Sequence, residues 1–141
     1  MKKFLWAALL AVLTSLGAKA QDFRIEVVPG VPEAASALLV QRFTQMLEAG
    51  GFTVWAPSEE AQEAPEGLRV LSVGHTITSR MDTPGSITQV ALGIELTAKV
   101  GETVQQFTIK GVGNDFADAW LRAVKQLLPR SREAQAFVGR L

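Results

Sequence analysis

The chain has 141 residues, with 14 basic and 14 acidic side chains and no cysteine. The balanced charge gives no sign of a nucleic-acid-binding protein. The missing thiols exclude disulfides, cysteine redox chemistry and lipid attachment to an amino-terminal cysteine, so packing alone must hold the fold together.

Residues 1–20 have the three parts of a cleavable secretory signal. A pair of lysines is followed by an apolar stretch at 4–16 and by Ala18-Lys19-Ala20. The apolar stretch is shorter than the roughly 20 residues that a bilayer-spanning helix needs, so we expect cleavage before Gln21 rather than stable membrane insertion. An uncleaved anchor and a buried amino-terminal helix are the alternatives. The pattern predicts a periplasmic or secreted protein.

Removal of these 20 residues leaves 121, with 11 basic and 14 acidic side chains. This length fits one soluble domain over 21–141 and is too short for two ordinary ones.

Alternating side chains at 23–28 predict a first strand. A helix is expected over 33–49, because apolar residues recur there every three or four positions and Gly50-Gly51 follows as a helix end does. A short second strand is expected at 52–55. The next stretch, 56–67, is polar and predicts a solvated loop that carries Glu59, Glu60, Glu63 and Glu66.

The second half predicts a meander of three strands, at 68–79, 90–100 and 103–112, with a turn-rich loop at 81–85 and a tight turn at Gly101-Glu102. Asn114 or Asp115 is expected to cap a last main helix, which Pro129 ends. Its apolar stripe consists of Phe116, Trp120, Val124, Leu127 and Leu128. A short amphipathic tail follows at 131–141.

These elements predict an α+β fold: a single, mostly antiparallel sheet with two main helices packed on one face. The expected order is β-α-β-β-β-β-α plus a short C-terminal helix.

Three segments of the sequence match the pattern of a known family. They are Phe23-Arg24-Ile25-Glu26-Val27-Val28, the helix end Leu47-Glu48-Ala49-Gly50-Gly51-Phe52-Thr53-Val54, and Gly111-Val112-Gly113 with its following Ala119/Ala123 helix. In this pattern the chain resembles the amino-terminal domain of TolB, the curli secretion component CsgG and the penicillin-binding-protein activator LpoB. The resemblance implies an envelope-facing interaction module. The chain lacks the lipid-attachment cysteine, a second domain and a membrane hairpin, so the resemblance does not extend to secretion-channel function.

The residues give little support for catalysis. His75 is the one histidine, and it lies in the apolar row of its strand without a recognisable nucleophile motif. We therefore expect a structural or partly exposed histidine, and a protein that is not an enzyme and needs no cofactor.

Metal and phosphate sites are equally weak predictions. Asp115 and Asp118 lie three apart at a helix start, where capping explains them better than a metal does. Gly111-Val112-Gly113 precedes a helix, but Phe116 stands where a dinucleotide-binding motif needs its third glycine. A flexible strand-to-helix turn is the simpler interpretation.

Two groups of residues are candidates for binding. Arg80, Met81 and Asp82 are expected to project from the loop between two strands. Arg130 and Arg132 belong to a basic carboxyl-terminal set with Arg122, Lys125 and Arg140, which suits an acidic partner or anionic lipid. A plain surface connection and ordinary helix-end charge are the alternatives.

Three functional classes follow, led by a non-enzymatic module that binds an envelope protein through a sheet edge or the loop. The second is a subunit of an envelope assembly, such as a homo-oligomer, with contacts through Trp55, Trp120 or the tail residues Phe137, Val138 and Leu141. The third is a small enzyme or ligand carrier that uses His75 or a pocket that the sequence does not reveal.

Overall fold

The computed structural model describes residues 22–57, 63–82 and 89–141. The predicted signal at 1–20, Glu59 and Glu60 of the acidic stretch, and residues 83–85 of the predicted turn lie outside these ranges.

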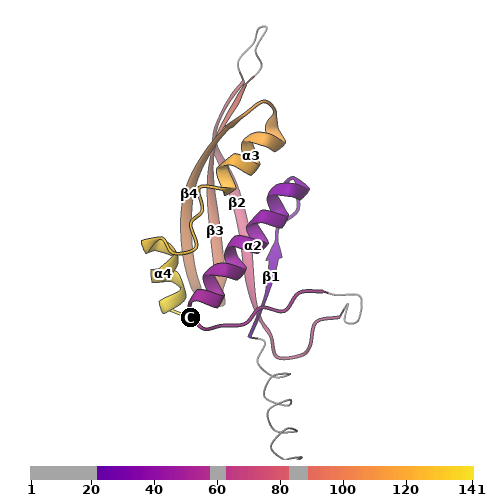
Figure 1. The fold of residues 1–141 in the computed structure, drawn as a ribbon, viewed down its shortest axis with the longest axis vertical. Coiled ribbons are helices and arrows are strands. Elements are labelled where there is room, and N and C mark those ends of the chain that lie inside the picture. Colours follow the sequence, from indigo (N-terminus) through magenta and orange to yellow (C-terminus); the bar gives the residue numbers. More distant parts are fainter. Residues whose placement is uncertain (1–21, 58–62, 83–88) are drawn as a thin grey trace, which may run out of the picture.

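One four-stranded sheet, in the order β1-β2-β3-β4, forms the centre of the fold (Figure 1). Its strands are β1 (Phe23–Val27), β2 (Arg69–Asp82), β3 (Val90–Val100) and β4 (Thr103–Gly113). β1 is parallel to β2, whereas β2–β3 and β3–β4 are antiparallel. The α+β class and the mostly antiparallel sheet are therefore as predicted.

Three helices in the described ranges pack against this sheet: α2 (Glu33–Ala49), α3 (Phe116–Val124) and α4 (Arg132–Gly139). They cover one face of the sheet (Figure 1), where side chains such as Ile94, Leu96 and Phe107 are buried. The side chains between them, Thr108 and Lys110 among others, lie exposed on the opposite face. We refer to that uncovered side as the open face.

The predicted strand at 52–55 is present as a single parallel β-bridge between Phe23 and Val54. Its backbone bonds join Phe23 N–H to Thr53 O at 3.1 Å and Trp55 N–H to Phe23 O at 2.7 Å. The segment therefore borders the start of β1.

The end of α2 shows how Gly50 and Gly51 place the next residue. Phe52 N–H donates to Leu47 O at 3.0 Å, and Gly51 N–H donates to Glu48 O at 3.0 Å. This pair of bonds is a Schellman motif, which needs a left-handed residue, and Gly51 supplies it with φ 88°. The motif turns Phe52 back against Phe23, with ring centroids 5.2 Å apart.

The prediction for α3 was too long. The helix ends at Val124, and Leu128 is 58% exposed rather than part of the buried stripe. After Val124 the backbone tightens into i→i+3 hydrogen bonds, from Gln126 N–H to Ala123 O and from Leu127 N–H to Val124 O, both at 2.9 Å.

Candidate functional site

Arg80, Met81 and Asp82 are the last residues of β2, not part of a projecting loop as predicted. The register between β2 and β3 shifts between Ile77 and Ser79, so one extra residue bulges out of the strand. Beyond the bulge, Arg80 pairs with buried Leu92 on the helix-covered face, and Met81 pairs with Ala91 on the open face. Alternation along the strand therefore divides the predicted site between two faces, and the bulge determines which face each residue takes.

Arg80 makes contacts within the protein. Its Nε lies 3.3 Å from Asp82 Oδ1, and its guanidinium lies 5.0 Å from the centre of the Phe116 ring at the start of α3. An exposed ion pair of this kind adds little stability. Arg80 and Asp82 thus cover the α3 end of the core, whereas Met81 is 69% exposed.

The structure also separates Arg130 from Arg132. Arg132 is the first residue of α4 and is exposed. Arg130 instead lines two neighbouring cavities between α2 and the segment that leads into α4, of about 560 and 710 Å³. We call the two cavities together the α2–α4 groove.

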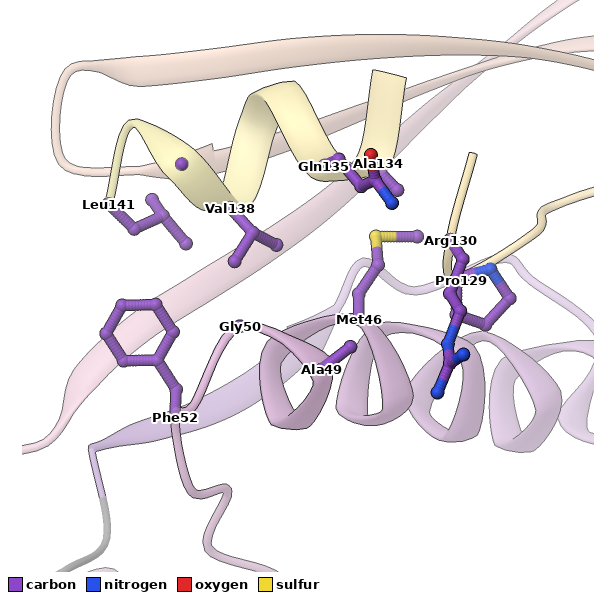
Figure 2. A pocket seen from close by; sticks show the side chains of 11 residues that line it. Met46, Ala49, Gly50, Phe52, Pro129, Arg130, Ala134, Gln135, Val138 and Leu141 are labelled. Carbon is purple, nitrogen blue, oxygen red and sulfur yellow. The ribbon is translucent and has the colours of Figure 1, made fainter. Parts of the chain in front are cut away.

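The first cavity of this groove is mainly apolar (Figure 2). Met46 points from α2 toward α4, while Val138 and Leu141 point back from the α4 side. Phe52, placed by the α2 end, faces Leu141 at one end of the cavity, and Arg130 lies at the other. The cavity thus offers apolar contact with a cation at its far end.

The second cavity continues past Arg130 and has charged and polar residues in its lining. It is lined by Arg42, Gln45, Glu48, Ala49, Leu128, Pro129, Arg130 and Ser131. The Nε atom of Arg42 is buried and has no hydrogen-bond partner among the described residues. A buried donor without a partner is costly, so an acceptor that reached it would gain a hydrogen bond.

His75 packs against the core. Its ring meets the Trp120 ring edge to face, with centroids 5.0 Å apart and an 85° angle between planes. His75 Nδ1 and Trp120 Nε1 are both buried without a hydrogen-bond partner among the described residues. A general base needs an orienting partner and a reactive group within hydrogen-bond distance, so this geometry describes a packing role for His75.

The two aspartates at the start of α3 act as caps. Asp115 Oδ1 accepts from Asp118 N–H at 2.7 Å, and Asp118 Oδ2 accepts from Asn114 N–H at 3.0 Å and from Arg122 Nε at 3.1 Å. The Asn114 hydrogen bond and Arg122 hold the pKa of Asp118 below its usual value of 3.8, against an opposing effect of burial. Within the described residues, no group of three or more His, Cys, Asp or Glu side chains is arranged to hold a metal ion.

The predicted turn at Gly111-Val112-Gly113 is part of β4. A Cβ at Gly111 would lie 2.5 Å from Ala123 N and would clash with Ala119 O. A Cβ at Gly113 would lie 2.5 Å from Ala119 N. The two glycines therefore let α3 lie directly on the strand, a role that the sequence analysis missed.

Trp120 and Phe137 are fully buried in the core, so neither is available for the subunit contacts considered above. Among the described helices, none is both long and apolar enough to cross a membrane.

No protein-family model and no curated protein matches the chain. A solved structure that is similar to it is described as a minor lipoprotein from Acinetobacter baumannii. The two are 13% identical, with a TM-score of 0.40, over 86% of this chain and 88% of the lipoprotein. Likeness at this level does not transfer function. The proposals below rest on the chain's own residues.

Proposed function

We propose that the chain is an exported, non-enzymatic interaction module of the bacterial cell envelope, which binds a protein partner in the α2–α4 groove. The observation that carries the proposal is the combination, in one groove, of an apolar lining with the cationic residues Arg130 and Arg42. Export follows from the predicted signal at 1–20, and the envelope location from the resemblance to bacterial envelope domains.

The lining defines the chemistry of the partner segment. An apolar side chain would fit between Met46, Phe52 and Val138, where burial of apolar surface favours binding. A carboxylate or carbonyl oxygen next to it would meet Arg130 and Arg42. The partner segment is therefore apolar with an adjacent acidic group.

Filling the groove tests this assignment. Ala49 lines both cavities and is exposed, so Ala49→Trp would occupy the groove without disturbing the core. Ala34→Trp is the matched control, because Ala34 is exposed on the same helix and lines neither cavity. Arg130→Glu reverses the charge.

The purified exported protein and its three variants would be used for affinity capture from the native envelope fraction, followed by titration with the purified partner. We expect Ala49→Trp and Arg130→Glu to lose the partner and Ala34→Trp to keep it. A partner retained by Ala49→Trp would place binding elsewhere on the molecule. Light scattering on the same samples identifies the alternative, a homo-oligomer, by a mass that rises with concentration.

A further inference from the structure

The outer edge of β4 exposes backbone hydrogen-bonding groups. Arg140 Nη2 donates to Val104 O at 3.1 Å, and Gln105 Nε2 donates to Gln106 O at 3.2 Å, so these two carbonyls point away from β3. Backbone direction alternates along a strand, and the β3–β4 register has no shift. The N–H and C=O groups of Thr108, Lys110 and Val112 therefore point outward as well.

These outward groups lack backbone partners. Within the described residues, no backbone hydrogen bond outside the β3–β4 ladder reaches Thr108, Lys110 or Val112. An edge of this kind is a template for pairing with another strand.

A groove runs beside this edge. Two cavities, of about 430 and 350 Å³, lie between β4 and the segment that joins α3 to α4. A neighbouring strand lies roughly 4.8 Å from the strand it pairs with, so an added strand would enter this groove. Its side chains would then alternate between the groove wall and the open face.

The groove is basic at one end and has both apolar and polar residues, Glu133 among them, at the other. Lys110, Arg122 and Lys125 line the cavity beside Val112. Arg122 is paired with Asp118, whereas Lys110 and Lys125 form no ion pair with any described residue. At the other end, the 58% exposed side chain of Leu128 lies beside Ile109.

We propose that the outer edge of β4 binds an extended, acidic segment of a partner protein by strand addition. The backbone of Thr108 to Val112 supplies the pairing, an acidic side chain meets Lys110 and Lys125, and an apolar side chain covers Leu128. The inference rests on the proposed function in that the occupant is a protein, but it uses a different surface from the α2–α4 groove. Ala49→Trp therefore leaves this site intact, and the two proposals fail separately.

The test uses a phage-displayed library of random linear peptides, selected against the purified exported protein. We expect enrichment of peptides that combine Asp or Glu with β-branched residues. Hydrogen exchange with a synthetic copy of a selected peptide should slow at the amides of Thr108, Lys110 and Val112.

One substitution removes a single backbone donor from the edge. Thr108→Pro deletes the N–H that faces outward and leaves the β3–β4 ladder intact, since proline is tolerated on edge strands. We expect it to weaken peptide binding roughly tenfold, as loss of a hydrogen bond to a partner does. Thr108→Ala, which keeps the N–H, should bind within about twofold of the wild type.

A second pair of variants tests the charge without altering the backbone. Lys110→Glu combined with Lys125→Glu should abolish binding of the acidic peptides, and Lys99→Glu, on the open face of β3, should not. Selection of no acidic peptide, or equal binding to Thr108→Pro, would overturn the proposal. A dimer of the wild type that Thr108→Pro dissociates would also overturn the proposal, because the occupant would then be a second copy of this chain.

Discussion

Gly111 lies where α3 leaves no space for a side chain on β4. A methyl group there would press on the backbone of α3 at Ala119 and Ala123, and neither helix nor strand can move without opening the core. We expect Gly111→Ala to lower the free energy of unfolding by about 1–3 kcal/mol, the usual cost of overpacking. Urea denaturation measures it.

Gly139 provides the matched control for that substitution. A Cβ at this position in α4 meets no atom within 4 Å. Gly139→Ala should leave stability unchanged or raise it by up to about 1 kcal/mol, because alanine favours helix. If Gly111→Ala and Gly139→Ala unfold at the same urea concentration, close packing of α3 against Gly111 does not determine the stability of the first variant.

Asp118 is a residue whose titration affects stability. Its pKa in the folded protein lies below 3.8 because it accepts the Asn114 N–H bond and lies beside Arg122. A depressed pKa means that the stabilisation is present above the unfolded-state value and is lost as the pH falls through the folded-state value. Acid therefore removes the contribution of Asp118.

We expect Asp118→Asn to be less stable than the wild type at neutral pH, with the difference shrinking as the pH falls below 3.8. Thermal unfolding across the acid range measures it. Glu102→Gln, in the exposed β3–β4 turn, serves as the control for general charge effects. A difference that stays constant with pH would show that the carboxylate's charge is not involved.

At the scale of the elements, the start of α3 resolves an alternative that the sequence left open. Asp115, not Asn114, supplies the capping side chain, while Asn114 contributes its backbone N–H. Asp115→Ala should therefore cost about 1 kcal/mol of stability, and Asn114→Ala less than about 0.5 kcal/mol. Chemical denaturation of both variants tests the assignment, which fails if Asn114→Ala is the more damaging.

The sequence predicted elements well where local patterns decide them. Alternation in 90–100 and 103–112 gave β3 and β4, and the glycine pair gave the end of α2. It could not predict the faces of Arg80 and Met81, because the bulge before them depends on tertiary contact. Gly93 lies beneath that bulge, where a Cβ would lie 2.5 Å from Ser79 Oγ. One extra residue is enough to exchange the two faces of a strand.

At the scale of the whole molecule, the candidate site depends on contacts between distant segments. Arg130 was predicted from the clustering of basic residues. Its place in a groove could not be predicted, because the groove forms only where the end of α2 lies opposite α4. Arg42 carried no sequence signal, because one arginine in an amphipathic helix resembles any other. The groove beside β4 was also hidden, since the predicted meander ordered three strands but did not place the first strand, so it left open whether β4 lies at an edge.

Arg69 joins the two ends of the described chain. Its backbone N–H donates to Asp22 O at 3.0 Å and its Nη1 donates to Leu141 O at 3.1 Å, so both ends meet at one end of the sheet. Figure 1 shows the carboxyl terminus beside the start of β1. A short linker from Leu141 to Asp22 would thus suit a circular permutant opened in the exposed Gly101-Glu102 turn. Every strand pairing would survive in that chain, and β4 would become its first element.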